Sequence, residues 1–460
     1  MRRNFLYKSS LFVPKYVDKV LLKQYNVFVL NLFPNIHKGV NMERTILHCD
    51  LNAFYASVEI LLNPELKGKA VAVCGSKEDR HGIVLAKSDL AKKYGVQTGE
   101  AIWQAQQKCP DLIIVPPRFD EYMKYSAIAR RIYEDYTDLI EPFGIDECWL
   151  DVTASRLLFG SGEEIAQILR HRLKEEVGLT ISVGVSFNKI FAKLGSDLKK
   201  PDAVTVIPKK SFRSLIGGLP ASDMLGVGRS SMKFLKNYGI RTINELADMD
   251  VRFLEEKLGK CGRQIWMYAN GLDDSPVRHM SCCEPIKSVG HGTTCTTDLF
   301  TEDEVWQVIY GLSQDVSKRL RKYKLRAGGV QIAVKDNLLR TKQYQHPLVA
   351  PVQSFAEIAE NAFSLFRQNY KWERGVRALT VRTINLLPEA DDEPQQLFFE
   401  DSNASRREKR DRIELAIEKI RSRYGNDAIN MGSLFAADDI TAEEIPNTMP
   451  TGMRLVSDSI

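Results

Sequence analysis

Residues 48–59 read HCDLNAFYASVE and join two different patterns of hydrophobicity. The run TILHCDLN (45–52) is apolar and strand-like up to Asp50, whereas AFYASVEILLN (53–63) has the spacing of an amphipathic helix. Asp50 therefore ends an apolar strand directly before a helix. Outward from this junction, strand-like and helix-like runs alternate to about residue 220, which predicts a mixed α/β domain.

A second group of acids follows in GIDECWLDV (144–152), where Asp146 and Glu147 precede a short apolar strand. Neighbouring residues of a strand point to opposite faces, so the two acids share a site only if the backbone turns there, and Pro142 and Gly144 favour such a turn. Carboxylates are the ligands that Mg²⁺ prefers, and two such ions can clamp a phosphoryl transfer. Taken one at a time, each acid is better explained as a turn residue or an ordinary strand-edge charge.

Composition favours a globular, multidomain protein of a reducing compartment. The 460 residues are 44% hydrophobic and 27% charged, and the eight cysteines form no CxxC pair. The first 41 residues contain no clean apolar core of a secretory signal, and YNVFVLNLF (25–33) is too short to span a bilayer. We interpret residues 1–41 as an upstream extension or a start-site artefact; the alternative is a membrane-associating arm.

Charge is distributed unevenly along the chain. Residues 286–388 contain fifteen Lys and Arg against nine Asp and Glu, whereas the tail from Glu389 contains nine against sixteen. The basic block has the pattern strand, helix, strand, strand, helix, strand, and the tail contains an acidic linker followed by a charged helix at 406–424. A basic domain beside an acidic appendage suggests one polyanion-binding domain.

Three motifs in the same order carry a family resemblance: HCDLNAFYASVE (48–59), GIDECWLDV (144–152) and GVSFNKIFAKLGSDLKKP (184–201). They closely resemble the palm motifs of the Y-family DNA polymerases, the translesion enzymes, and the resemblance covers about residues 42–390. It implies an α+β multidomain fold with a mixed or antiparallel palm sheet, small fingers, a helix-hairpin-helix thumb and a β-α-β-β-α-β little finger. The implied ranges are 42–75 and 118–209 for the palm, 76–117 for a helical fingers insertion, 210–280 for the thumb, 286–388 for the little finger and 389–460 for the linker and tail.

The resemblance also implies a catalytic centre with two Mg²⁺ ions. Asp50 and Asp146 match the metal-binding aspartates of the family, helped by the backbone carbonyl of Leu51. Glu147 matches the catalytic glutamate, which binds the metal that activates the primer 3′-hydroxyl. Many family members have a second acid two residues after the first aspartate, where this chain has Asn52.

Four further positions match nucleotide contacts of the family. Tyr55 occupies the steric-gate position, where its ring would clash with a ribose 2′-hydroxyl, and Phe54 is expected to line the same pocket. Lys189 matches a lysine that meets the triphosphate. In the fingers, Lys92 stands where the family has an arginine, and Asp89 stands in place of a tyrosine.

Two regions are expected to hold DNA and one to bind a partner. Gly226, Val227 and Gly228 resemble the turn of a helix-hairpin-helix, whose backbone amides approach a phosphate. In the basic block, DNA contacts are expected from the strand residues Arg340, Lys342, Arg377 and Arg382, on the sheet face opposite the helix. Gln396, Leu397, Phe398 and Phe399 resemble the peptide by which bacterial polymerases bind the sliding clamp; their packing back on the core is the alternative.

The sequence thus predicts a template-directed DNA polymerase that extends primers past damaged bases, with low fidelity and without proofreading. The expected partners are primer-template DNA, deoxynucleoside triphosphates and the sliding clamp, for a cytoplasmic monomer without membrane segments. One alternative is another palm-type nucleotidyl transferase or cyclase, against which Tyr55, the thumb turn and the basic domain argue. The other is an inactive paralogue acting as a DNA- and clamp-binding scaffold, against which the intact acids argue.

Overall fold

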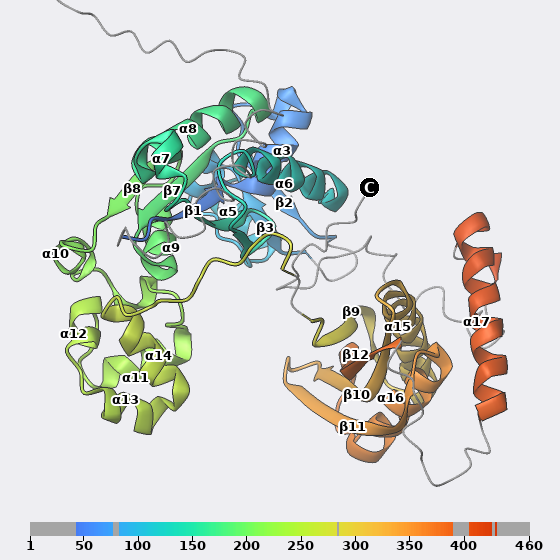
Figure 1. Cartoon of the computed structure of the whole chain (residues 1–460). Coiled ribbons are helices and arrows are strands. Elements are labelled where there is room, and N and C mark those ends of the chain that lie inside the picture. Colours follow the sequence, from blue (N-terminus) through green and yellow to red (C-terminus); the bar gives the residue numbers. More distant parts are fainter. Residues whose placement is uncertain (1–42, 77–81, 283–284, 390–403, 426–427, 430–460) are drawn as a thin grey trace, which may run out of the picture. The chain divides into compact units, whose positions relative to one another are not determined.

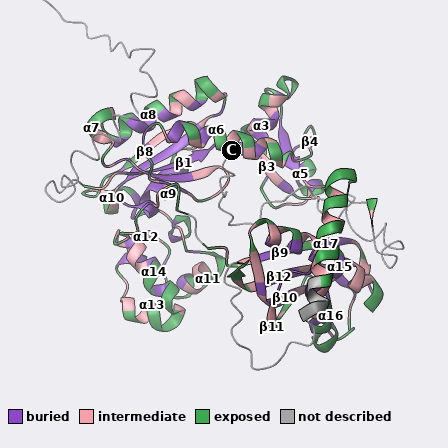
Figure 2. Cartoon of the chain, turned by 45° about the vertical axis from the view of Figure 1, so that its right-hand side comes forward, coloured by how far each residue is buried: buried purple, intermediate pink, exposed green. Residues whose placement is uncertain are grey.

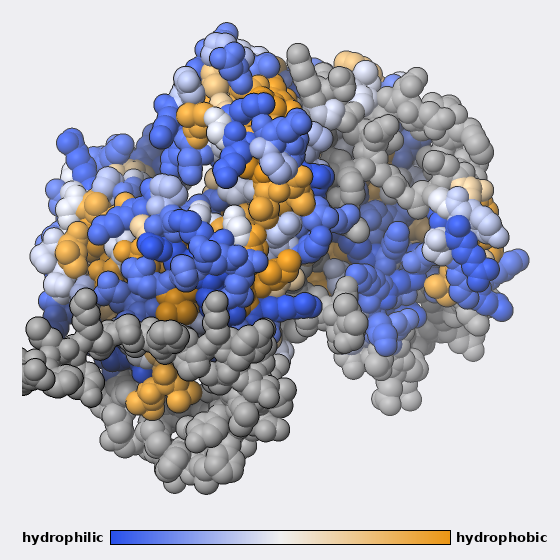
Figure 3. All heavy atoms as spheres, turned by 90° about the horizontal axis from the view of Figure 1, so that it is seen from above, coloured by the Kyte–Doolittle hydropathy of each residue, from blue (hydrophilic) through white to orange (hydrophobic). Residues whose placement is uncertain are grey.

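The computed structural model describes residues 43–76, 82–282, 285–389, 404–425 and 428–429 (Figure 1). The segment 1–41 and the clamp-like peptide 396–399 lie outside the described residues. The described residues fall into two compact units, one formed by residues up to Phe54 and 120–282, the other by 55–119 and the residues from 283 onward. None of the described helices combines the length and apolar composition that a bilayer crossing requires. Hydrophilic side chains cover most of the visible described surface, with smaller apolar areas between them (Figure 3).

The first unit contains a five-stranded sheet in the order β5-β6-β1-β7-β8. Its strands are β1 (Ile46–Leu51), β5 (Ile140–Pro142), β6 (Glu147–Asp151), β7 (Ile181–Ser186) and β8 (Val204–Ile207). All neighbours are antiparallel except β7 and β8, which are parallel, so the expected mixed sheet is confirmed. The central strands β1 and β7 are buried along their whole length, as their apolar sequences predict (Figure 2).

Helices cover both faces of this sheet. They are α6 (Phe119–Tyr133), α7 (Arg156–Phe159), α8 (Gly162–Arg172) and α9 (Lys189–Leu198). On one face, Ser196 of α9 hydrogen-bonds His48 of β1. On the other, Gly162 of α8 approaches the side chain of Leu47. Helix α9 therefore packs on the face of β1 from which Asp50 can be reached.

A close approach between α9 and β7 requires glycine at position 184. A Cβ atom on Gly184 would lie 1.9 Å from the carbonyl oxygen of Ala192, which no real side chain tolerates. Asn188 fixes the start of the helix, because its Oδ1 accepts a hydrogen bond from the backbone N–H of Phe191 at 2.8 Å. These two features set the position of Lys193, which directly follows Ala192.

Short helices form a separate lobe after the sheet, as the glycine-punctuated sequence predicts. They are α10 (Phe212–Ile216), a 3₁₀ turn (Ala221–Asp223), α11 (Arg229–Asn237), α12 (Ile243–Ala247), α13 (Val251–Leu258) and α14 (Lys260–Ala269). Their core is continuous with Ile190, Phe191 and Leu194 on the side of α9 that faces away from the sheet. Helix α9 thus has apolar contacts on both sides.

The second unit contains a small three-stranded sheet in the order β3-β2-β4, formed by β2 (Val71–Cys74), β3 (Val84–Lys87) and β4 (Ile113–Val115). The helices of this region are α3 (Phe54–Leu62), α4 (Asp89–Lys93) and α5 (Ile102–Lys108). The fingers insertion is therefore not only helical, because it contributes two strands. Strand β2, which we expected in the palm, pairs with both of them.

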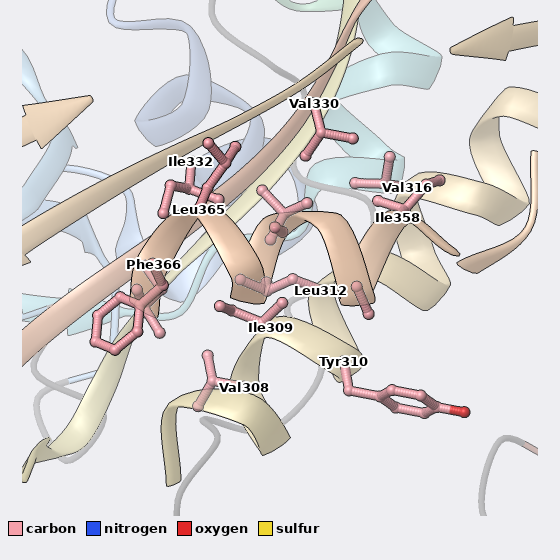
Figure 4. Packing of buried hydrophobic residues seen from close by; sticks show 14 of the residues in the cluster. Val308, Ile309, Tyr310, Leu312, Val316, Val330, Ile332, Ile358, Leu365 and Phe366 are labelled. Carbon is pink, nitrogen blue, oxygen red and sulfur yellow. The ribbon is translucent and has the colours of Figure 1, made fainter. Parts of the chain in front are cut away.

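The basic block has the predicted order of elements. A four-stranded antiparallel sheet, β11-β10-β12-β9, consists of β9 (Ser288–Leu299), β10 (Leu325–Asp336), β11 (Thr341–Val352) and β12 (Val376–Pro388). Helices α15 (Glu302–Lys322) and α16 (Phe355–Asn369) bury apolar residues against it. Figure 4 shows Leu312 and Val316 of α15 near Ile358 of α16 and Val330 of β10, in one core. A last helix, α17 (Ala404–Tyr424), follows.

Candidate active site

Strand pairing brings the acids together. Asp50 of β1 is directly opposite Glu147 of β6 in the register of the two antiparallel strands. The backbone N–H of Leu51 donates to the carbonyl oxygen of Asp146 at 3.0 Å. The backbone N–H groups of Phe143 and Gly144 both bond the carbonyl of Glu147, which closes a turn before β6. Asp146 lies in this turn, so the predicted change of direction is present and both acids lie beside Asp50.

Two lysines contact these carboxylates. Lys193 Nζ lies 2.5 Å from Glu147 Oε1 and 3.3 Å from Asp50 Oδ2. Lys200 Nζ lies 2.6 Å from Asp50 Oδ2 and 2.7 Å from Asp197 Oδ1. The cluster therefore has acids from two strands and ammonium groups from α9 and the segment directly after it.

Burial and the interactions among the three acids shift their pKa values. Burial and the neighbouring charge of Asp50 raise the pKa of Asp146 to about 6. Burial and the hydrogen bond with Asp50 raise the pKa of Glu147 to about 8. Burial acts in the same direction on Asp50, but the hydrogen bond with Glu147 and the charges of Lys200 and Lys193 outweigh it and lower its pKa. A proton is thus held more easily by Glu147 than by Asp50.

This donor set fits a hard divalent cation. Carboxylates whose pKa values are raised by burial and by mutual repulsion are stabilised in their charged form by a nearby cation. Within the described part of the chain, no group of three or more His, Cys, Asp or Glu side chains is placed so that it could hold a metal ion as it stands. Ammonium groups contact the carboxylate oxygens instead, and these would have to yield to a metal ion.

Tyr55 and Phe54 lie on the same helix but in different surroundings. The ring of Tyr55, on α3, is half-buried and meets the edge of Phe119 with centroids 6.0 Å apart. Phe54 is only 3% exposed, and its ring packs against Tyr122 at 6.2 Å. Phe54 is therefore a core residue, and the expectation that it lines the same pocket as Tyr55 is not supported by its burial.

Lys189, expected at the triphosphate, has a different partner. Its ammonium lies 2.8 Å from Glu141 Oε2 and 4.6 Å from the centre of the Trp149 ring. The residue is 9% exposed, and Arg278 binds the same carboxylate. A lysine in this buried pair cannot also reach a triphosphate, so this assignment is corrected.

The residues that sequence reasoning missed are Lys193, Lys200 and the role of Asn52. Lys193 lies one helical turn after Lys189 on the same helix. The sequence does not distinguish which of the two lysines reaches the acids. Asn52 accepts a hydrogen bond from the backbone N–H of Asp202 and donates one to Ser182. It fastens the segment after Lys200 beside β1. Lys92 is exposed on α4, and nothing in the structure tests its predicted phosphate contact.

The predicted DNA contacts have mixed positions. Gly226 has φ +91°, a left-handed conformation that favours glycine, and Gly228 precedes α11, so the Gly226–Gly228 turn leads into a helix N-terminus. Arg340 is exposed in the hairpin between β10 and β11, and Arg377 lies at an irregularity of β12.

Lys342 is opposite Val334, whose side chain is 1% exposed in the core under the helices. Directly opposed residues share a face, so the expectation that Lys342 lies on the face opposite the helices is wrong. Arg382, which was also expected on the face opposite the helices, is opposite Gln331 on the open face, where Lys335 also lies by strand alternation.

Two family models match the chain, described as the impB/mucB/samB family over residues 49–197 and its C-terminal domain over residues 286–398. A DNA polymerase IV from Acetivibrio thermocellus is 49% identical over 393 residues, covering 85% of this chain and 98% of the relative. DNA polymerase IV 1 from Bacillus subtilis is 35% identical, covering 86% and 94%. A solved Y-family DNA polymerase chimera superposes with a TM-score of 0.67 at 25% identity, covering 75% of this chain and 99% of that one.

These matches span both the sheet that holds the acids and the basic C-terminal domain. They agree with the strand order, the acid cluster and the β-α-β-β-α-β block described above, and they imply dependence on a divalent metal ion. The chain therefore belongs to the Y family of DNA polymerases as a DNA polymerase IV, a DNA-directed DNA polymerase of the translesion type.

Proposed function

We propose that Asp50, Asp146 and Glu147 hold two Mg²⁺ ions, with the backbone carbonyl of Leu51 as a further ligand. The observation that carries this proposal is the direct opposition of Asp50 and Glu147 on neighbouring strands, beside the turn that contains Asp146. When bound, the ions supply charge stabilisation for the attacking and leaving oxygens of the phosphoryl transfer. The raised pKa of Glu147 belongs to the metal-free site, and a bound ion would hold this carboxylate in its ionised form as a ligand.

Nucleotide binding is assigned to the lysines of the cluster and to Tyr55. Lys200 and Lys193 provide positive charge beside the acids, where the phosphates of an incoming nucleotide would develop negative charge. Lys92 of α4 remains a proposed phosphate contact of the fingers. The half-buried ring of Tyr55 is proposed as the steric gate against ribonucleotides.

Primer-template DNA is assigned to two surfaces. The backbone amides at Gly226, Val227 and Gly228 are proposed to bind a phosphate without reading sequence. Arg340 and Arg377, together with Arg382 and Lys335 on the open sheet face, are proposed to contact the DNA backbone. Such binding weakens with salt because phosphate neutralisation releases counterions.

Three further assignments come from the sequence. The peptide Gln396–Phe399 is proposed to bind the replication sliding clamp, because its two aromatic residues stand in an acidic, polar sequence and would favour a partner pocket. A cytoplasmic location is proposed because the substrate is DNA and the cysteines have the pattern of a reducing compartment. A monomeric state is proposed as well.

Primer extension tests the central assignment. With Mg²⁺ and deoxynucleotides, the purified protein should extend a primed template, and Asp146→Ala or Glu147→Ala should reduce extension at least a thousandfold while DNA binding persists. Asp111→Ala, an exposed acid outside the cluster, is the matched control and should extend normally. Robust extension by either cluster variant would contradict the assignment, and a wild-type protein that binds DNA without extending it would favour the scaffold alternative.

A further inference from the structure

Helix α17 is attached to the C-terminal domain by a buried carboxylate. Glu414 is 4% exposed, and its oxygens accept hydrogen bonds from Ser354 Oγ at 2.6 Å and from the backbone N–H groups of Phe355 and Ala356 at 3.0 and 3.3 Å. These amides belong to the first turn of α16, so Glu414 caps that helix from another segment of the chain. An acid in this position fixes which face of α17 is turned inward.

The same face of α17 makes the remaining contacts. Glu418 lies 2.7 Å from Arg321 of α15, and Arg421 donates to Gln314 of α15 at 2.7 Å. Arg410 lies 3.3 Å from Glu360 of α16. Positions 410, 414, 418 and 421 repeat at helical spacing and form one stripe, so α17 packs with a polar face on α15 and α16.

The opposite face of α17 is basic. Lys409, Arg412, Lys419 and Arg423 are all exposed and, with Ala416, form the stripe that lies roughly opposite Glu414 on a helix of about 3.6 residues per turn. Within residues 409–424 the acids Asp411, Glu414 and Glu418 lie outside this stripe. The structure records no ion pair of these four basic side chains with any described residue. Figure 2 shows how much of α17 is exposed.

We propose that this basic stripe is a second DNA-binding surface, which takes the backbone of a duplex segment other than the one held by the sheet. From Lys409 to Arg423 the stripe is about 21 Å long at 1.5 Å per residue, enough to follow roughly six phosphates of one strand. Helices α15 and α16 separate α17 from the sheet, which places the stripe roughly 20 Å from the open face. One short straight duplex cannot contact both surfaces.

DNA is favoured over an acidic protein surface by the composition of the stripe. Protein interfaces are centred on aromatic or aliphatic anchors, whereas the only uncharged member of the stripe is Ala416. The exposed large apolar residues of this helix lie on its two flanks, between the polar faces: Leu415 on one flank and Ile413, Ile420 and Tyr424 on the other. Evenly spaced cations without apolar anchors match the repeating charge of a nucleic-acid backbone.

A capture experiment separates the two surfaces. The full chain is bound to an immobilised primed template whose primer is chain-terminated, with the next nucleotide added to hold the complex, and a second duplex of 20 base pairs is then passed over it. The wild type should capture the second duplex. The variant with Lys409, Arg412, Lys419 and Arg423 changed to Gln should capture it at least tenfold more weakly. For this variant, the plot of log affinity for the second duplex against log salt concentration should be less steep by roughly 3 to 4.

Two controls make the result specific. Glutamine is a good helix former and the inward contacts are untouched, so α17 should stay in place; changing the exposed Lys67, Lys69, Lys124 and Arg131 to Gln gives a variant with the same loss of charge elsewhere. Extension of a short primed template should be equal in all three proteins, which separates this proposal from the assignments at the acids. Equal capture by the α17 variant, or a wild type that extends primers but captures no second duplex, would overturn the proposal.

Discussion

The ammonium of Lys193 lies 2.5 Å from Glu147 Oε1, between this acid and Asp50. A cation of the protein itself therefore neutralises the carboxylates that we assign to Mg²⁺. Two positive charges about 4 Å apart repel each other by about 4 kcal/mol at an effective dielectric constant of 20. The lysine and a metal ion consequently compete for the same oxygens.

Removing this charge should tighten metal binding and weaken nucleotide binding. For Lys193→Met we expect the affinity for Mn²⁺ without nucleotide to rise about tenfold or more, and the KM for deoxynucleotides to rise. Titration of Mn²⁺ followed by electron paramagnetic resonance measures the first effect. Lys199→Met removes an exposed lysine of the same segment and is the control; a Lys193 variant with unchanged or weaker metal affinity would show that no competition exists.

Stability of the metal-free protein should fall as pH rises. Asp146 and Glu147 have pKa values raised to about 6 and about 8 in the folded state, so the folded protein binds more protons than the unfolded chain above the ordinary pKa values of these acids. Their contribution is fully present near pH 4 and is lost as pH passes through 6 and then 8. The lowered pKa of Asp50 acts in the opposite direction, but only at lower pH.

Urea unfolding between pH 5 and 8.5 in the presence of a chelator measures this effect. We expect the free energy of unfolding to decrease on the order of 2 kcal/mol more in the wild type than in Glu147→Gln. Saturating Mg²⁺ should reduce the decrease because it favours the ionised carboxylates. Identical pH dependence of the two proteins would contradict the raised pKa of Glu147.

Sugar discrimination should depend on Tyr55. Tyr55→Ala removes the half-buried ring on α3, so the ratio of kcat/KM values for deoxynucleotides over ribonucleotides should fall at least a hundredfold, mainly because ribonucleotides are used better. Single-nucleotide incorporation gives both values. Phe54→Leu, a change at the neighbouring core residue, should leave the ratio unchanged; an unchanged ratio in the Tyr55 variant would remove the gate assignment.

Clamp stimulation should depend on the apolar residues of the linker. Alanine at Leu397, Phe398 and Phe399 should reduce the stimulation of synthesis by the sliding clamp at least tenfold, because aromatic anchors carry most of the free energy of such interfaces. Clamp-free extension, compared on the same template, should be unaffected. Full stimulation of the triple variant would favour the alternative that these residues pack on the core.

The sequence predicted the parts of the fold that local patterns determine. The order of strands and helices in residues 286–388 and the strand before Asp50 followed from hydrophobic periodicity, and the turn before Glu147 followed from Pro142 and Gly144. Partners distant in the sequence could not be predicted in this way. Glu141, which binds Lys189, is 48 residues away from it, and only packing shows that this lysine is buried while Lys193 reaches the acids.

The tail shows the same limit more clearly. Glu414 belongs to a segment of mixed charge that is typical of a solvated helix, and periodicity gives no reason to bury it. Its burial results from the free amides at the start of α16, which are 58 to 59 residues earlier in the chain. The charge total of the tail likewise hid the basic face of α17, because the acids Asp411, Glu414 and Glu418 lie outside that face.

Metal stoichiometry tests the central claim most directly. In the complex with primed DNA and a nonhydrolysable deoxynucleotide, electron paramagnetic resonance should count two Mn²⁺ ions per wild-type chain. Asp50→Asn and Asp146→Asn should each bind fewer than two at the same free Mn²⁺ concentration, while DNA remains bound. Two ions in both variants, at wild-type affinity, would contradict the assignment of these acids as the metal ligands.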